Sequence, residues 1–325
     1  MSNRIFRILI LILLLGNSAT QQLSNRLYAS GVGTTGAAFL KVGAGARATG
    51  MGEAFVGVSD DVDAIYWNPA GLTQIKSKEV NFMYNFYMIN PAFQNMGYTY
   101  LAYAQPLIIK EKNLGAVGAN FIYGNYGTFL GYDENGNKSA NFACSDLLVT
   151  FAYARDVNVK GIDLALGANL KIISETLADR NALSIGFDFG GLYKFKKMPL
   201  SVGLTVQNLG TPLTFISEPA PLPAMIKLGA GYRMSINSLS NILISSDLLM
   251  PFDSIMGFRM GAEYVYNEMF AARLGYKIDS AININPLAGL TVGVGFKWNK
   301  YSADFAFIPY GDMGNAYRLS LGATF

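Results

Sequence analysis

The 325-residue chain contains no histidine and a single cysteine, Cys144. Without histidine it can form neither a Ser-His-Asp nor a Cys-His catalytic site, nor a His-ligated zinc site. With one cysteine it cannot form an internal disulfide. Carboxylate, lysine and tyrosine chemistry stay open. The sequence nevertheless supplies no recognisable set of catalytic parts, so we predict no enzyme activity, no catalytic residue, no metal site and no cofactor.

Charge is also scarce, and long apolar runs are absent after residue 19. Charged residues make up 14% of the chain and hydrophobic residues 51%, whereas charged residues average about 25% in soluble domains. A spanning helix needs roughly 20 consecutive apolar residues. An apolar chain without such runs fits one architecture well, in which alternating strands place one face in lipid and the other in a lumen.

The first 19 residues have the features of a secretory signal peptide. Arg4 and Arg7 precede the apolar stretch ILILILLL at 8–15, and small residues follow at 17–19. The alternative, a membrane anchor, requires a longer run. We therefore predict export and a signal peptide over residues 1–19. Because its removal leaves the net charge close to zero, no electrostatic argument favours nucleic acid as a partner.

Period-two alternation recurs along the rest of the chain. In LTVGVGFKW, residues 290–298, one face carries Leu, Val, Val, Phe and Trp, and the other carries Thr, Gly, Gly and Lys. IKLGAGYRM at 226–234 follows the same pattern. Such alternation predicts strands. A soluble β-sandwich would also alternate, but aromatic residues at the ends of the apolar faces favour a membrane barrel with interfacial girdles.

The pattern predicts an all-β fold, a transmembrane antiparallel β-barrel of about 14 strands over residues 78–325. The two segments 95–105 and 240–250 alternate least clearly. The expected strands are 78–88, 95–105, 113–123, 146–156, 161–173, 182–195, 198–208, 224–234, 240–250, 257–266, 269–277, 288–298, 300–308 and 316–325.

The connections between these strands alternate in length. Short ones lie at 157–160, 196–197, 267–268 and 299, whereas 124–145 and 209–223 are long. Outer-membrane barrels pair short periplasmic turns with long outer loops, so the first strand is expected to begin on the periplasmic side. Cys144 falls in the first long loop. Leu213, Phe215 and Ile216 make the second one apolar, which suits either a landing site for a ligand or a partner surface.

Residues 20–77, ahead of the barrel, are rich in glycine and do not alternate. GVGTTG at 31–36 matches a dinucleotide-binding pattern, but neither the required strand nor the helix flanks it. Ser59 is expected to cap a short helix that Pro69 ends, and so short a helix must pack on something. We expect this segment to fill the polar lumen, where Arg47, Asp60 and Asp61 would face lumen charges. Those charges are Arg233, Arg259, Glu263 and Arg273.

The stretch FLKVGAGARATGMGEAFVGVSDDVDAIYWNPAGL, residues 39–72, resembles the N-terminal signature of the PorV/PorQ family, which is related to the FadL-type outer-membrane transporters. The resemblance implies a 14-stranded barrel in the outer membrane of a Gram-negative bacterium, with residues 20–77 as an internal helical hatch or plug. The residues expected to build the hatch are Arg47, Gly50, Gly52, Asp60, Asp61, Trp67, Asn68, Pro69 and Gly71.

The resemblance implies two alternative functions. PorV/PorQ-type proteins serve type IX secretion, so the chain is expected to lie in outer-membrane lipid and to bind a translocon or cargo proteins. FadL-like relatives instead carry hydrophobic small molecules such as long-chain fatty acids, and a greasy pocket beside the hatch would favour this second role. Nothing in the sequence separates a PorV role from a PorQ role.

Overall fold

The computed structural model describes residues 33–88, 96–278, 286–310 and 314–325. The predicted signal peptide and residues 20–32 of the predicted hatch lie outside these ranges, and so do the first two residues of GVGTTG. Within the described ranges, no helix combines the length and the apolar composition needed to cross a bilayer.

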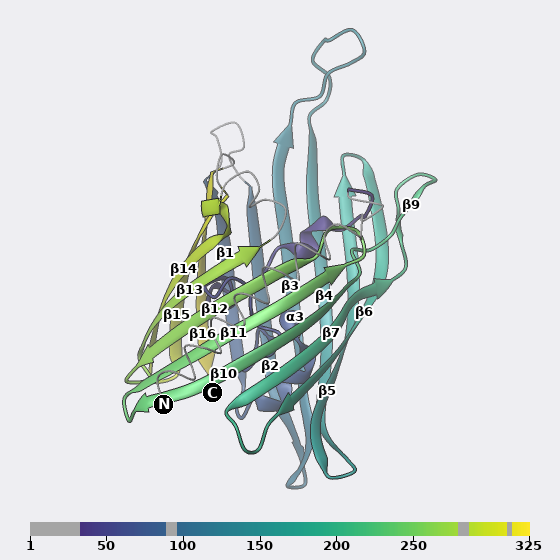
Figure 1. The fold of residues 1–325 in the computed structure, drawn as a ribbon. Helices are drawn as coiled ribbons and strands as arrows, with labels where there is room; N and C mark the ends of the chain where they lie inside the picture. The colour runs from purple at the N-terminus through teal and green to yellow at the C-terminus, as the bar shows by residue number, and fades with distance from the viewer. Residues whose placement is uncertain (1–32, 89–95, 279–285, 311–313) are drawn as a thin grey trace.

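Fourteen antiparallel strands of the described chain close into a barrel (Figure 1), which confirms the predicted fold class. Each strand pairs with its neighbours in sequence, and β1 closes the ring against β16. The barrel strands are β1 Glu79–Met88, β2 Gly97–Ile109, β3 Lys112–Phe129, β4 Phe142–Val159, β5 Ile162–Leu177, β6 Arg180–Lys194, β7 Leu200–Gly210, β10 Met225–Asn237, β11 Ser240–Pro251, β12 Gly257–Tyr266, β13 Phe270–Ile278, β14 Leu290–Trp298, β15 Tyr301–Pro309 and β16 Asn315–Thr324.

The remaining elements are short. Among the residues from 33 to 77, four helical turns precede the barrel: η1 Ala38–Lys41, α2 Ala46–Gly50, α3 Ala64–Trp67 and η2 Pro69–Gln74. A fifth turn, η5 Pro286–Gly289, leads into β14. Between β7 and β10, the strands β8 Leu213–Thr214 and β9 Pro219–Ala220 form a separate two-stranded sheet.

The barrel wall is taller on one side than on the other (Figure 1). β3 and β4 have 18 residues each, whereas β13, β14 and β15 have 9. The expected long loop at 124–145 is therefore wrong in extent, because β3 continues to Phe129 and β4 begins at Phe142. Cys144 accordingly lies in β4, opposite Leu177. The alternation fades there because a strand that extends beyond the lipid has no apolar face to maintain.

The two ends of the barrel differ in their connections. We call one end the turn end, where connections such as 160–161 and 299–300 join the strands and where β1 begins. The other is the loop end, which carries the connections 130–141, 211–224 and 252–256. The outer wall between the two ends exposes large apolar side chains, among them Phe121, Phe151 and Leu274. A surface of this kind suits lipid and not water.

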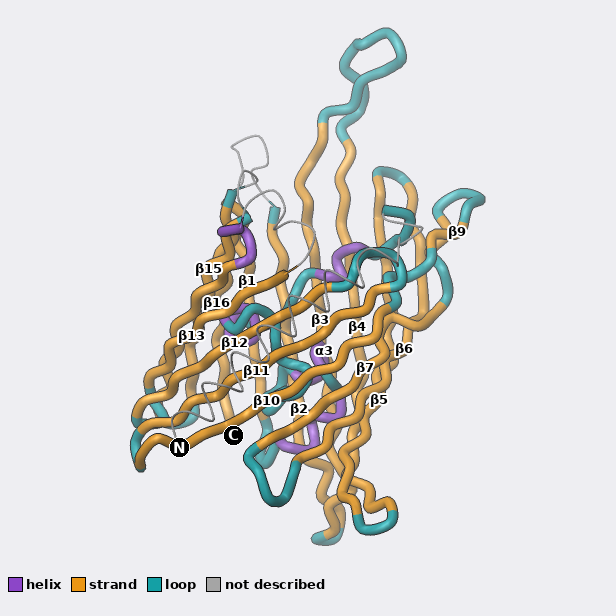
Figure 2. The backbone as a smooth tube through the Cα atoms, in the orientation of Figure 1, coloured by secondary structure: helices purple, strands orange, loops and turns teal. Residues whose placement is uncertain are grey.

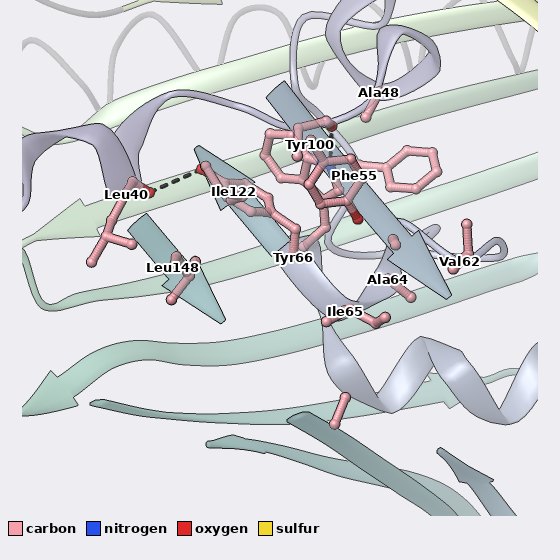
Figure 3. Close-up of a cluster of buried hydrophobic side chains, with 14 of the residues drawn as sticks. Leu40, Ala48, Phe55, Val62, Ala64, Ile65, Tyr66, Tyr100, Ile122 and Leu148 are labelled. Atoms are coloured by element: carbon pink, nitrogen blue, oxygen red, sulfur yellow. Dashed lines mark hydrogen bonds between the residues drawn. The ribbon is translucent and has the colours of Figure 1, made fainter. Parts of the chain in front are cut away.

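The described residues ahead of β1, 33–77, form what we call the inner segment, which lies inside the ring of strands (Figure 2). Its buried side chains pack against strands β2, β3 and β4. In Figure 3, Phe55, Ile65 and Tyr66 of the inner segment gather with Tyr100, Ile122 and Leu148 of these strands. The Tyr66 hydroxyl donates to the Leu40 carbonyl, 2.9 Å away. The main apolar core is thus shared between the inner segment and the wall.

Glycines line the contact between the inner segment and the rest of the wall. A Cβ added to Gly57 would lie 2.6 Å from the Ala230 nitrogen, and one added to Gly275 would lie 1.9 Å from the Gly52 nitrogen. A Cβ added to Gly203 would lie 2.2 Å from the Val56 carbonyl oxygen. Backbone therefore touches backbone, and no side chain fits between them. The glycines that alternate on the predicted polar faces of the strands thus make room for the inner segment.

Substituting Gly275 with alanine tests this contact. The added methyl group would meet the backbone of Met51 and Gly52, which cannot move as a side-chain tip can. We expect Gly275→Ala to lower the free energy of unfolding by about 1–3 kcal/mol, the usual cost of overpacking, and to lower the temperature at which the compact band is lost on SDS gels. Gly191→Ala is the matched control, because its Cβ would meet only the Leu166 side chain, at 3.9 Å. Equal behaviour of the two variants would contradict the close contact.

Candidate functional site

The helix expected near residue 60 begins later than predicted and is not capped by Ser59. α3 spans Ala64–Trp67 with Asp63 before it, and no side chain caps it. The Ser59 hydroxyl donates instead to the Phe55 carbonyl, 2.7 Å away, and Ser59 has a φ of 33°. Ser59 therefore closes the preceding turn. The error came from treating the acids at 60–63 as a first helical turn, whereas Asp60 and Asp61 are bound to Arg47.

The turn at Asn68-Pro69 has the backbone geometry that proline imposes. Asn68 is extended, with φ −156° and ψ 103°, and Pro69 opens η2. The Asn68 side chain accepts from the Ala70 N–H at 3.2 Å and donates to the carbonyls of Val56 and Gly191, at 3.0 and 3.1 Å. One amide therefore fixes the turn, the inner segment and strand β6 together.

Trp67 and Gly71 complete the packing of this turn. The Trp67 indole nitrogen donates to the Ala44 carbonyl at 2.9 Å, and its ring centroid lies 4.9 Å from that of Tyr66. The Lys227 ammonium lies 5.1 Å from the centroid of the Trp67 ring, within cation–π range. A Cβ added to Gly71 would lie 2.0 Å from the Ser59 carbonyl oxygen, so only glycine fits there.

Several polar side chains of the wall hold the inner segment, and three that were not predicted from the sequence are Asn169, Gln207 and Asp247. Asn169 donates to the Ile65 carbonyl at 2.8 Å, and Gln207 donates to the carbonyls at the end of α3. Asp247 accepts the backbone N–H groups of Phe55 and Val56, at 2.8 and 2.9 Å. Their positions on the lumen faces of β5, β7 and β11 were the available signal. Their targets are backbone groups, which a sequence pattern does not reveal.

A network of charges joins the inner segment to the wall nearer the turn end. Arg47 binds Asp60 at 2.7 Å, Asp61 at 2.8 Å and Glu263 at 2.8 Å. Glu263 also accepts from Arg273 at 2.7 Å, and Arg273 reaches Asp304 at 2.6 Å. Arg233 pairs with Asp60. Three of the four lumen charges expected to face the inner segment thus join this network.

The fourth expected lumen charge, Arg259, lies on the other side of the inner segment. Its guanidinium lines a chamber near the loop end together with Glu53, Lys227 and Lys277. Gly50 and Gly52 do not bind charges. A Cβ on Gly50 would lie 3.0 Å from the Gly293 Cα and one on Gly52 would lie 2.6 Å from the Met260 carbonyl oxygen, so both belong to the glycine contact.

Burial and neighbouring charges separate the pKa values of the three acids that precede α3. Burial favours the neutral form of Asp60, but Arg47 and Arg233 outweigh it and lower the pKa of that carboxyl. Burial raises the pKa of Asp61 to about 6 against the pull of Arg47. Burial and the neighbouring Asp61 raise the pKa of Asp63 to about 8, despite two hydrogen bonds from Asn81. Asp63 is therefore largely protonated at neutral pH.

Two chambers of similar size lie inside the barrel. The loop-end chamber, about 400 Å³, is lined by apolar and aromatic side chains together with cations. The turn-end chamber, about 420 Å³, is lined by charges of both signs. Arg47 and the acids at 60–61 border the turn-end chamber, whereas Tyr66 and Trp67 border the loop-end chamber. The inner segment therefore separates the two.

The apolar loop between β7 and β10 is less exposed than expected. Leu213 is fully buried and would contact a Cβ at Gly36, so it cannot serve as a landing site. Phe215 packs against the core, and Ile216 remains exposed at 79%. The loop folds back onto the start of the inner segment, where the Gly36 N–H donates to the Pro221 carbonyl at 3.0 Å.

Within the described residues, no group of three or more His, Cys, Asp or Glu side chains is arranged to hold a metal ion. The charged clusters instead consist of acids paired with arginine or lysine.

Comparisons with known proteins show the fold. No known protein-family profile matches the chain, and no curated protein matches its sequence. Among solved structures, the Ralstonia pickettii toluene transporter TbuX is similar, with a TM-score of 0.59 and 16% identity over 87% of this chain and 98% of that one. The Pseudomonas putida toluene transporter TodX gives 0.55 and 14%, over 87% and 96%. A Pseudomonas aeruginosa FadL homologue gives 0.50 and 13%, over 85% and 97%. The chain thus has the FadL-type outer-membrane barrel fold, and its resemblance to PorV/PorQ stays a prediction.

Removing Arg47 tests the charge network. Arg47→Gln would leave Glu263, Asp60 and Asp61 buried with fewer partners, so we expect the free energy of unfolding to fall by about 3 kcal/mol, as when one member of a buried ion pair is lost. Lys196→Gln is the control, because it breaks only the exposed pair with Asp163 and should change stability by less than about 1 kcal/mol. Urea unfolding of both variants measures the difference. An Arg47 variant as stable as the control would contradict a structural role for the network.

The pKa of Asp63 predicts how stability changes with pH. Its pKa is about 8 in the folded protein and about 4 when unfolded. The folded state therefore holds a proton that the unfolded state releases, and stability rises as pH falls from about 9 towards 5. Asp63 lines a cavity of about 70 Å³, and the other charged or titratable groups that face it there are Arg47, Asp61, Glu79 and Asp304.

We expect the thermal midpoint, followed by circular dichroism, to be higher at pH 6 than at pH 9. Asp63→Asn should reduce this difference, because the amide is neutral at both pH values. An undiminished difference in the variant would show that another group carries it.

Proposed function

We propose that the chain is a non-enzymatic outer-membrane channel that passes small hydrophobic or amphipathic molecules. The observation that carries this proposal is the loop-end chamber. Val42, Met225 and Leu249 give it apolar walls, Tyr66 and Trp67 of the inner segment form its floor, and Ile255 and Tyr310 place it beside the loops. A pocket of about 400 Å³ suits a small organic molecule.

The structures of similar fold support the same reading. TbuX and TodX are named as toluene transporters, and a further neighbour, CymD, as a monoaromatic hydrocarbon channel. All three share the fold with this chain at low sequence identity, so the solute has to be inferred from the residues that line this chain's own chamber. The exposed apolar belt of the wall supports a position in outer-membrane lipid.

A role in type IX secretion stays a prediction of the sequence resemblance. The residues that carry the resemblance, such as Phe55, Trp67 and Leu72, are buried inside the barrel. They offer no surface to a translocon or a cargo protein, so they support the presence of a hatch and not the choice of partner. Recovery of a large translocon with the tagged protein from native outer membranes would favour the secretion role over passage of small molecules.

A sealing role of the inner segment is tested by Trp67→Ala combined with Asn68→Ala. These changes remove the ring at the chamber floor and the amide that ties the turn to β6. We expect a severalfold rise in ion conductance in planar bilayers and faster uptake of toluene into proteoliposomes.

Trp298→Ala is the control for this double variant, because Trp298 is 67% exposed on the outer wall. It should leave conductance unchanged. Unchanged conductance in the double variant would count against sealing, and the absence of toluene uptake by any form of the protein would overturn the proposed function.

A further inference from the structure

The outer wall carries an apolar groove on strands β10 to β14, with a volume of about 450 Å³. Strands β10 and β11 are the green strands in the foreground of Figure 1. The groove begins at Leu200, where β7 starts at the turn end, and reaches Leu290, where β14 starts at the loop end. Small residues form its floor, and they are Ala230, Ser246 and Ala262.

The wall behind this groove is thin, because small residues occupy both of its faces. On the lumen face, a Cβ added to Gly261 would lie 2.3 Å from the Met51 carbonyl oxygen, and one added to Gly229 would lie 2.6 Å from the Gly57 nitrogen. On the outer face, the floor residues are alanine and serine. The strands therefore have backbone contacts on the inside and few packing partners on the outside. An occupant of the groove would supply the missing dispersion contacts.

The groove belongs to the apolar belt of the outer wall, and its own lining is uncharged. Leu274 is part of both the belt and the groove, and the exposed Leu228 continues the belt towards the loop end. None of the described residues that line the groove carries a charge. The belt contacts the acyl chains of the bilayer. A flexible acyl chain can follow an apolar groove, so the surroundings supply a lipid as its occupant.

The two ends of the barrel differ in the charge of the connections that join the strands. At the turn end, the described connections carry Lys110, Lys160, Lys196, Lys197 and Lys300, against Glu111 and Glu268. At the loop end, they carry Asp133, Glu134, Asp179, Glu218 and Asp253, against Lys138. The turn end therefore attracts the phosphate of a lipid headgroup, whereas the loop end repels it.

The connection between β6 and β7 brings a lysine to the turn-end limit of the groove. Lys197 shortly precedes Leu200, which lines the groove. The Pro199 carbonyl accepts from the Arg233 N–H at 2.9 Å, and this hydrogen bond holds the connection against β10. The adjacent Lys196 is engaged in an ion pair, whereas Lys197 is exposed. A lysine side chain can lie along an apolar wall and place its ammonium at the level of the headgroups.

We infer that the groove is a specific site for one anionic phospholipid of the leaflet at the turn end. One acyl chain of this lipid lies in the groove, and its phosphate is bound by Lys197. The lipid supports the thin wall from the outside, at the place where the inner segment contacts it from the inside. This inference goes beyond the proposed function and does not depend on which solute the chain passes.

The test measures lipid retention by native mass spectrometry of the detergent-solubilised protein. Phosphatidylglycerol, which is anionic, and phosphatidylcholine, which is zwitterionic, are added separately with the same acyl chains. We expect the wild type to retain one phosphatidylglycerol molecule, and to retain phosphatidylcholine about fivefold less well, as one lysine beside an anionic headgroup implies. Lys197→Gln should remove this preference. Ala262→Phe places a ring over the groove floor and should lower retention of either lipid about tenfold.

Lys160→Gln and Ala272→Phe are the matched controls. Lys160 is an exposed lysine of another turn-end connection, and Ala272 is an exposed residue of β13 that does not line the groove. Both variants should retain lipid as the wild type does. Equal retention of the two lipids by the wild type would overturn the inference, and so would undiminished retention by Ala262→Phe. A lipid-free dimer would also overturn it, because the groove would then belong to a second copy of the chain.

Discussion

The structure depends on direct contact between the backbone of the inner segment and the backbone of the barrel wall. Gly203, Gly229, Gly261 and Gly275 make this contact, because each lies where a Cβ would overlap the inner segment. Because no layer of side chains separates the two, the backbone of the inner segment lies directly against the wall of the lumen. Hydrogen bonds from wall side chains can therefore reach its backbone, as Gln207 and Asp247 show.

Much of the barrel could be predicted, because lipid on one side and a lumen on the other impose alternation on each strand. Strand β12 was expected at 257–266 and lies there. The prediction failed where this constraint ends, as in β3 and β4 beyond the lipid. In the inner segment, the turn at Asn68-Pro69 followed from local chemistry. The role of Ser59 did not, because its partner is a backbone carbonyl four residues earlier.

The candidate site, like the fold, could be predicted from the sequence only in part. Charges on lumen faces were visible in the sequence, and in the structure Arg233, Glu263 and Arg273 contact Arg47 and Asp60 directly or through one another. The separation of charge between two chambers was not visible. It depends on which lumen residues lie above the inner segment and which lie below, and that depends on strand tilt and register. Burial then sets the ionisation of each acid, which composition alone cannot give.

The position of the two tryptophans gives the protein an optical label of its own. Trp67 is 3% exposed at the floor of the loop-end chamber, and Trp298 is 67% exposed on the outer wall. The chain has no other tryptophan. We expect a quencher carried in the lipid to reach Trp298 on the outer wall, whereas Trp67 is reached only by a quencher small enough to enter the loop-end chamber. Replacing Trp298 with phenylalanine would leave an emission spectrum that reports on the inner segment alone.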